Sequence, residues 1–340
     1  MTVPTAEGRP AERLRIGLAC TGWAAEWAVH DPIRNGSLAE VVFAASRAPA
    51  FAADYADSHV IPQSGSWGSL LACEEVECVY VAVPNSAHAL FVEEALLAGK
   101  HVLCEKPLTR SGDIAARLAE LAASQGLVLA EGMHHRYYPP LQAAVRALRS
   151  GVVGRLRRIE VDYGWLLDRG QDIRWASGLD GGALMDVGCY GLDILHWIAG
   201  GPLRVIESSC KRSPSGVDSS SSVELAGVGL TGVVRASLAS AELVCRAEVV
   251  GSGGRAVLER PCLPVLPTEH RRMDFSMSVN GMELPLGTDS KTSYHYQLDA
   301  FIRAVRVGEV SDPGGLELVA RARLLDQACN SLRGKNEQPV

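Results

Sequence analysis

Short apolar runs alternate with stretches of helical periodicity along residues 14–150. A short apolar run bounded by turn residues predicts a buried strand, and apolar residues at helical spacing predict an amphipathic helix. The predicted strands span residues 14–20, 40–46, 79–83, 101–104 and 127–130. The predicted helices span about 23–34, 50–55, 68–73, 90–99, 113–124 and 141–148. Strands that alternate with helices in this way are typical of a doubly wound parallel sheet.

Residues 79–107 contain a complete strand-helix-strand unit. Such a unit nearly always joins two parallel strands by a right-handed crossover. The second strand is followed by Glu-Lys-Pro, which places the Lys106 cation just beyond the carboxyl end of a buried strand. Ligands bind at this edge of open α/β sheets, so Lys106 is the first catalytic candidate. The alternative is a solvated loop charge.

Beyond residue 150 the pattern changes to runs in which apolar and polar residues alternate, as in strands buried on one face. These runs span residues 156–165, 203–209, 221–230, 232–238, 243–250, 256–259, 273–279 and 282–286. Asn280-Gly281 joins the last two and is a strong hairpin signal. Consecutive strands without helices between them indicate a largely antiparallel sheet. Helices are predicted at residues 188–198, 294–306 and 316–332.

These patterns predict an α/β fold class, with an N-terminal Rossmann-type doubly wound parallel sheet and a C-terminal α+β domain that holds a large, mostly antiparallel open sheet. At 340 residues the chain is longer than one ordinary domain. We expect a disordered lead-in at residues 1–12 and a nucleotide-binding domain at 13–135. A domain for substrate binding and oligomerisation follows at 136–312, and a C-terminal helix at 313–340 packs back on the domains.

Charge and composition exclude several classes of function. The net charge is -6, with 33 basic and 39 acidic side chains mixed along the chain, so we expect neither nucleic-acid nor membrane binding. No apolar run approaches the roughly 20 residues of a membrane span, and the N-terminus lacks the apolar core of a signal peptide. Nine scattered cysteines without a CxxC motif fit a cytoplasmic protein. No metal-ligand spacing is present, so we expect no metal site.

The turn after the first strand tests whether this half binds a dinucleotide. The dinucleotide fingerprint is G-x-G-x-x-G/A, because its first glycine makes the turn and its second lets the backbone approach the pyrophosphate. The three positions hold Cys20, Gly22 and Ala25. The Cβ of Cys20 stands where a positive φ is needed, so either the turn opens slightly or cofactor binding is weakened. The turn residues expected at the cofactor are Cys20, Thr21, Gly22, Trp23 and Ala24.

The end of the second strand bears on the choice between NAD and NADP. A carboxylate is expected there for NAD, because it accepts a hydrogen bond from the ribose 2′-hydroxyl. The chain has Ser46-Arg47 instead. A hydroxyl and the planar donor fork of an arginine suit a 2′-phosphate, so NADP(H) is favoured over NAD(H). The alternative is that Arg47 is a solvated charge.

Together these stretches resemble the Gfo/Idh/MocA family, the glucose-fructose oxidoreductase and inositol dehydrogenase superfamily. The matching segments are IGLACTGWAA, ASR after the second strand, AVPNSAHALFVEEALLAGKHVLCEKPL, GGALMDVGCYGLDILHW and SYHYQLDAFIRAVR. The resemblance covers nearly the whole chain in the right order, and EKP and GGALMDVGCY are its specific motifs.

In many family members the second specific motif supplies an aspartate and, four residues later, a histidine that works with the EKP lysine. The matching residues are Asp186 and Tyr190. Tyrosine also replaces histidine in a branch that resembles sugar 3-ketoreductases, glucose-fructose oxidoreductase and dimeric dihydrodiol dehydrogenase. The resemblance therefore implies that Tyr190 is the acid, with Asp186 orienting Lys106 or binding a substrate hydroxyl. The alternatives are that Tyr190 packs as a helix aromatic and that Asp186 caps a helix before Val187.

Proton transfer by Tyr190 needs electrostatic help. A phenol with a pKa of about 10 is a reluctant proton donor unless a cation stabilises its anion. We therefore expect Lys106 to lower the pKa of Tyr190 and to polarise the substrate carbonyl.

The resemblance also assigns residues that contact the cofactor or the substrate. At the cofactor it places Val83, Pro84, Asn85, His88, Glu105, Lys106, Arg174 and Trp175. An alternative for His88 is that its ring forms hydrogen bonds with nearby backbone groups. An alternative for Glu105 is that it holds the EKP turn in place. At the substrate it places His134 and Arg136 with Asp186 and Tyr190. His135, Tyr138, Tyr294 and Tyr296 have a similar status, and surface packing is an equal alternative for these four as well as for His134 and Arg136.

The function predicted from these residues is that of a cytoplasmic NADP-dependent oxidoreductase. Its substrate is a hydroxyl or ketone of a sugar, sugar nucleotide or related cyclic polyol. The alternatives are a dihydrodiol or xylose-type dehydrogenase and, in another class, a non-catalytic nucleotide-binding sensor that kept the fold. The resemblance further implies a homo-oligomer, a dimer or a tetramer, that pairs through the C-terminal sheet. Val223, Leu225, Val228 and Leu230 are compatible with that pairing.

Overall fold

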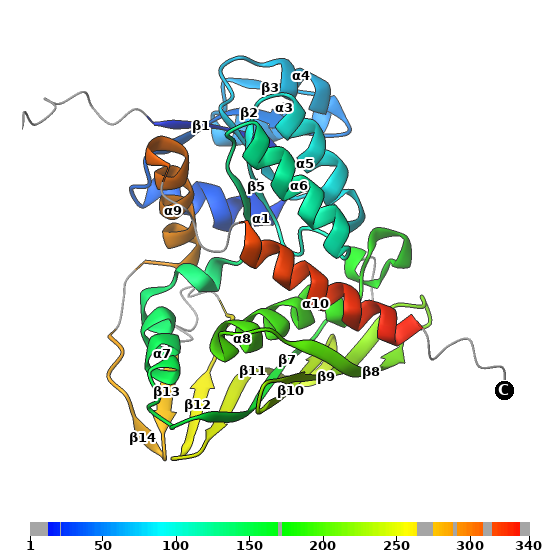
Figure 1. Cartoon of the computed structure of the whole chain (residues 1–340). Coiled ribbons are helices and arrows are strands. Elements are labelled where there is room, and N and C mark those ends of the chain that lie inside the picture. The colour runs from blue at the N-terminus through cyan, green and yellow to red at the C-terminus, as the bar shows by residue number, and fades with distance from the viewer. Residues whose placement is uncertain are drawn as a thin grey trace, which may run out of the picture.

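The computed structural model describes residues 13–20, 22–168, 172–263, 275–287, 291–308 and 315–333. Two sheets, each packed against helices, form the two halves of the molecule (Figure 1). The predicted lead-in at residues 1–12 and the predicted cofactor contact of Thr21 lie outside the described residues. No helix in the described part of the chain is long and apolar enough to cross a membrane.

The N-terminal sheet has six parallel strands in the order β3-β2-β1-β4-β5-β6. Its strands are β1 (Leu14–Ala19), β2 (Ala39–Ala45), β3 (Gln63–Gly65), β4 (Cys78–Val81), β5 (His101–Cys104) and β6 (Leu129–Glu131). Strand β3 was not predicted, because its three residues include no apolar run. The strand order reverses between β1 and β4, so a ligand crevice is expected beyond the carboxyl ends of these two strands.

Helices cover both faces of this sheet. One face carries α4 (Trp67–Ala72), α5 (His88–Leu97) and α6 (Gly112–Ser124). The other carries α1 (Trp23–Ala25), η1 (Glu26–His30), α2 (Asp31–Arg34), α3 (Pro49–His59) and α9 (Ser293–Val307). Leu298 and Phe301 of α9 share a core with Leu14 and Leu18 of β1. Helix α9 thus belongs to the N-terminal core, which corrects the assignment of residues 136–312 to one separate domain.

The C-terminal sheet has eight strands in the order β14-β13-β12-β11-β7-β10-β9-β8. They are β7 (Leu156–Leu166), β8 (Arg204–Arg212), β9 (Asp218–Gly227), β10 (Leu230–Ser237), β11 (Ala239–Gly251), β12 (Arg255–Glu259), β13 (Ser276–Val279) and β14 (Met282–Glu283). All neighbouring strands are antiparallel except β7 and β10. Asn280 and Gly281 adopt φ values of 50° and 82° in the predicted hairpin. The predicted fold class is therefore confirmed.

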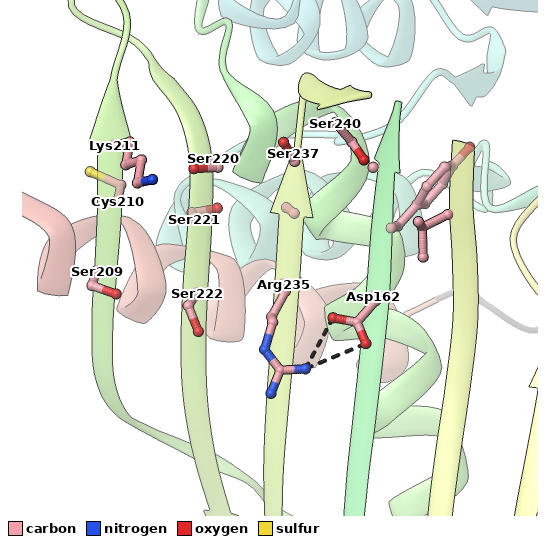
Figure 2. A pocket seen from close by; sticks show the side chains of 14 residues that line it. Asp162, Ser209, Cys210, Lys211, Ser220, Ser221, Ser222, Arg235, Ser237 and Ser240 are labelled. Carbon is pink, nitrogen blue, oxygen red and sulfur yellow. Dashed lines mark hydrogen bonds and ion pairs between the residues drawn. The ribbon is translucent and has the colours of Figure 1, made fainter. Parts of the chain in front are cut away.

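One face of this sheet is covered by α7 (Pro139–Arg149), α8 (Cys189–Ala199) and α10 (Leu316–Arg333). Helix α10 packs against both halves, with Leu318 in the N-terminal core and Leu325 in the C-terminal core. The other face is open and polar, and Figure 2 shows serine side chains beside the Arg235–Asp162 ion pair. Val223 and Leu225 point to the helices and are buried, so they cannot contribute to pairing through the open face.

Candidate active site

A cavity of about 780 Å³ lies between the carboxyl ends of the N-terminal strands and the C-terminal sheet. The turns after β1, β4 and β5 line one side, and β7, η4 (Ile173–Trp175), η6 (Leu184–Gly188) and α8 line the other. The predicted site residues that line it are Gly22, Trp23, Ala24, Val83, Asn85, His88, Glu105, Lys106, His134, Arg174, Asp186 and Tyr190. The cavity thus brings together residues that are far apart along the chain, from Gly22 to Tyr190 and on to Tyr294 of α9.

Lys106 and Asp186 form the charged centre of the cavity. The Lys106 Nζ donates to the Asp186 Oδ1 at 3.0 Å and to the Asp186 backbone carbonyl at 2.7 Å. The Arg174 Nε lies 3.1 Å from the same Oδ1. Asp186 sits within η6, a one-turn π-helix, a feature often found at functional sites. The predicted alternative that Asp186 caps a helix is therefore wrong, since its carboxylate binds two cations inside the helical segment.

These contacts keep both charges ionised. Burial raises the pKa of Asp186, but Lys106 and Arg174 outweigh burial and hold it below its usual value. Burial likewise lowers the pKa of Lys106, yet Asp186 holds it above its usual value. The site therefore presents a fixed ammonium group at neutral pH.

Tyr190, on the first turn of α8, lies beside this ion pair. The Lys106 Nζ is 4.9 Å from the centre of the phenol ring. The hydroxyl forms no hydrogen bond with any described residue, and the side chain lines the cavity. Burial raises the pKa of Tyr190 well above its usual value, and the lowering expected from Lys106 does not outweigh that effect. The lysine charge lies over the ring and is paired with Asp186, so burial dominates and Tyr190 stays protonated.

An aromatic wall surrounds Tyr190. The ring of Tyr163 lies 5.9 Å from it and that of His134 5.5 Å, while Tyr294 lies 4.4 Å from His134. Tyr163 and Trp165 line the cavity but were not among the predicted site residues. Alternation along β7 could have found them, because they continue the face of the buried Ile159 and Val161 toward the strand's end.

The turn after β1 is compatible with a bound dinucleotide. Cys20 does not adopt a positive φ, and Gly22 has a φ of -106°. A Cβ at Gly22 would meet no atom within 4 Å, so its backbone is open to a ligand. The steric objection to Cys20 therefore does not apply. Burial raises the pKa of its thiol to about 12, which keeps the group neutral.

The turns after β4 and β5 brace one another. The His88 ring nitrogens lie 2.8 Å from the carbonyl oxygens of Pro107 and Val83, so this ring satisfies local backbone, as in the alternative reading. The Asn85 amide donates to the Asp180 carbonyl at 2.9 Å and links the two halves of the cavity. Glu105 accepts a hydrogen bond from the Tyr80 hydroxyl at 2.8 Å, which holds the EKP turn.

Ser46 and Arg47 lie outside the lining of the cavity, at the end of β2. The Ser46 backbone amide donates to Gly65 on the neighbouring β3 at 3.2 Å. Arg47 is exposed and forms no hydrogen bond or ion pair with another described residue. Its guanidinium is therefore available to a ligand.

Two other predicted contacts are not supported. Arg136 is 2% exposed, does not line the cavity and forms an ion pair with Asp193 at 2.7 Å, so it belongs to the interior rather than to a substrate site. Trp175 is buried in a small apolar cluster, and its indole donates to the Asp168 carbonyl at 3.0 Å. The local sequence could not show that Arg136 and Trp175 are buried, because the residues that they contact lie outside the short segments that contain them.

Comparisons with known proteins agree with this geometry. Residues 14–133 match the GFO/IDH/MocA oxidoreductase family with an NAD-binding Rossmann fold, and residues 141–257 match the GFO/IDH/MocA C-terminal domain. The chain is 32% identical to D-xylose 1-dehydrogenase (NADP(+)) 2 of Haloferax volcanii, over 87% of this chain and 90% of the relative. It is 33% identical to the dTDP-3,4-didehydro-2,6-dideoxy-alpha-D-glucose 3-reductase of Saccharopolyspora spinosa, over 84% and 88%.

The fold also resembles that of solved structures. A 3-ketoreductase from Actinomadura kijaniata, in complex with NADP and TDP-benzene, matches with a TM-score of 0.83 and 24% identity, over 94% of this chain and 98% of the other. At that identity the likeness shows the shared fold.

Proposed function

This chain belongs to the Gfo/Idh/MocA family of NAD(P)-dependent oxidoreductases, and we propose that it interconverts a hydroxyl and a keto group on a sugar, sugar nucleotide or related cyclic polyol. The observation that carries the proposal is the pairing of Lys106 with Asp186 beside the protonated Tyr190. All three line one cavity together with the Gly22 turn. A binding-only protein has no need for this arrangement, which weighs against the non-catalytic alternative.

We assign the cofactor NADP(H), which when bound supplies or accepts the hydride. The residues present fit it, because Gly22 leaves its backbone open and the exposed Arg47 guanidinium, which binds no other described side chain, suits a 2′-phosphate. The curated relative named above is NADP-dependent by its name, which supports the same choice. Trp23 and Arg174 line the cavity beside the turn and complete this side of the site.

In the reducing direction, Tyr190 donates its phenolic proton to the substrate oxygen as negative charge develops there. A protonated phenol suits this role, because an alkoxide is far more basic than a phenolate. Lys106 stabilises the developing negative charge, and Asp186 holds the ammonium group in place. Arg174 supports the same carboxylate from the other side.

The test of the catalytic assignment is Tyr190→Phe, with Tyr163→Phe as the matched control. Both variants remove one phenolic oxygen from the same cavity. Tyr190→Phe should lower kcat by about 10²–10⁴-fold, as expected for loss of a general acid, while the Kd for NADPH stays the same. Tyr163→Phe should alter kcat much less. Equal losses in the two variants, or retained turnover in Tyr190→Phe, would contradict the assignment.

The test of cofactor choice is a fluorescence titration with NADPH and, separately, NADH. Arg47→Gln should weaken NADPH binding by roughly tenfold or more, because a charge-assisted contact to the 2′-phosphate is lost. NADH binding should not change. Equal effects on both nucleotides would assign Arg47 another role.

A xylose-type dehydrogenase is the second candidate, favoured by the similarity to the D-xylose 1-dehydrogenase over most of both chains. The two functions differ in direction and substrate. Reduction of NADP with free aldoses would support the xylose-type enzyme. Oxidation of NADPH with keto-sugars or keto-sugar nucleotides would support the reductase.

We also propose that two copies of the chain pair through the open face of the C-terminal sheet. We further propose that the protein works in the cytoplasm. No helix in the described part of the chain covers this face, which supports the pairing, and all nine cysteines are free thiols, which supports the cytoplasmic location. Ser222→Arg on this face should lower the mass measured by light scattering, whereas Ser124→Arg on the exposed end of α6 should not. A monomeric wild-type protein would contradict the pairing.

A further inference from the structure

Two neighbouring helices bring together side chains that can ligate a metal ion and that do not line the cavity. Glu26 and His30 occupy positions i and i+4 of the one-turn π-helix η1, and Tyr55 and His59 do the same on α3. Residues four apart lie on one face of a helix, so each helix presents a pair to the other. A π-helical turn again marks the segment that carries the polar side chains.

The ligand atoms lie close together. One atom from each of Glu26, His30 and His59 falls within 4.8 Å of the other two. The His59 Nε2 is 3.5 Å from the Glu26 Oε2. Tetrahedral zinc with ligands at about 2.0–2.1 Å separates neighbouring ligand atoms by about 3.4 Å, so this pair already has the needed spacing.

Neighbouring contacts orient these ligands. The His59 Nδ1 lies 3.0 Å from the Tyr55 carbonyl oxygen and 2.9 Å from the Ser58 hydroxyl. In the tautomer in which Nδ1 donates to that carbonyl, the Nε2 lone pair faces Glu26. The His30 Nε2 lies 2.9 Å from the Tyr55 hydroxyl. Arg34 binds the other carboxylate oxygen of Glu26 at 2.6 Å. Hydrogen bonds of this kind fix ring orientation and tautomer in metal sites.

We propose that Glu26, His30 and His59 form a binding site for one divalent transition-metal ion of the zinc class. Two imidazoles and a carboxylate are a ligand set that zinc accepts, and solvent can fill the remaining position because Glu26 and His59 are only partly buried. The ion joins η1, which follows the Gly22 turn, to α3, which follows Arg47. It therefore stabilises the N-terminal domain next to the two segments assigned to the cofactor.

Sequence spacing could not indicate this cluster, and the proposal departs from the expectation that the chain has no metal site. The ligands come from two helices, with 28 residues between His30 and His59. A plain Glu26–His59 ion pair is the competing explanation of the same contacts, and it requires a protonated His59 and binds no metal.

The test uses the full-length protein, purified without a metal-affinity tag and stripped with EDTA. Calorimetric titration with ZnCl₂ should show one more equivalent bound by the wild type than by His59→Gln. Co²⁺ should give visible absorption bands typical of four- or five-coordinate N/O ligation in the wild type and lose them in His59→Gln and His30→Gln. Saturating Zn²⁺ should raise the wild-type Tm by on the order of 5 °C, because an ion that binds only the folded state stabilises it.

The controls are His101→Gln, a histidine outside the cluster, and Cys210→Ser, a partly exposed thiol. Both should bind zinc like the wild type. If His59→Gln folds poorly, the zinc stoichiometries of Glu26→Gln and of the wild type decide between a metal site and a plain ion pair. The proposal is overturned if the wild type binds no zinc, if cluster variants and wild type bind equally, or if Co²⁺ shows only thiolate charge-transfer bands.

Discussion

Two aspartates on one continuous helical segment hold cations in opposite surroundings. Asp186 lines the cavity, is 9% exposed and binds Lys106 and Arg174. Asp193, seven residues later, is 0% exposed and binds His135 and Arg136 at 2.7 Å each. Positions seven apart lie on the same side of a helix, so one face runs from the cavity into the sealed interior.

The Asp186 and Asp193 clusters differ in whether a ligand can reach them rather than in their chemistry. In both clusters cations hold the pKa of an aspartate below its usual value against the effect of burial. Arg321 of α10 closes the interior cluster, with its Nε 3.3 Å from Asp193 and its Nη2 2.6 Å from Glu131. Perturbed ionisation therefore marks both a candidate active site and a structural network, and only the cavity distinguishes them.

The largest effect is expected from Asp193→Asn. It leaves Arg136 and Arg321 buried without their shared countercharge, which should lower the free energy of unfolding by about 3–5 kcal/mol. Asp162→Asn, which breaks the exposed pair with Arg235, is the control and should cost about 0–1 kcal/mol. Urea denaturation measures both. Turnover per folded molecule should be retained in Asp193→Asn, and its loss would show that the interior cluster serves the chemistry.

Lowering the pH gives a second test of how Asp193 contributes to stability. The folded-state pKa of Asp193 is depressed, so its contribution is present above the unfolded value of about 3.9 and is lost as pH falls through the folded value. The difference in stability between wild type and Asp193→Asn should therefore be constant from pH 7 to 5. Below about pH 4 it should shrink. A difference that grows on acidification would mean that another group controls the variant's stability.

Lys106→Met changes the cluster around Asp186 in the cavity, and we expect it to lower the turnover rate rather than the stability of the fold. Removal of the ammonium group should lower kcat by about 10²–10³-fold, or about 2.7–4 kcal/mol of transition-state stabilisation. Asp186 keeps Arg174 as a partner, so the urea midpoint should change little. Lys211→Met, an exposed lysine on the open sheet face of Figure 2, should leave turnover unchanged. A Lys106→Met variant that unfolds readily but turns over normally would reverse the roles of the two clusters.

The same two clusters show how far sequence reasoning reaches. Apolar runs and helical spacing predicted both sheets and placed Lys106 at the carboxyl end of β5, because these signals are local. The resemblance brought in Asp186 and Tyr190. Arg136 could not be placed, because its burial depends on Asp193 and on α10, far along the chain. The fate of a polar side chain next to a predicted site depends on such distant partners.

The smallest expected effect is that of Asp186→Asn, and it tests how the cavity cluster works. Asparagine keeps an oxygen for Lys106 and Arg174 but removes the charge, so kcat should fall by roughly tenfold. Burial lowers the pKa of Lys106 and Asp186 is the main group that raises it. Without the carboxylate that pKa falls, so the alkaline limb of the pH–rate profile should move to lower pH. If the alkaline limb stays in place while kcat falls, Asp186 acts on the substrate directly and not through Lys106. The resemblance between Asp186 and Asp193 is then limited to the geometry of their ion pairs.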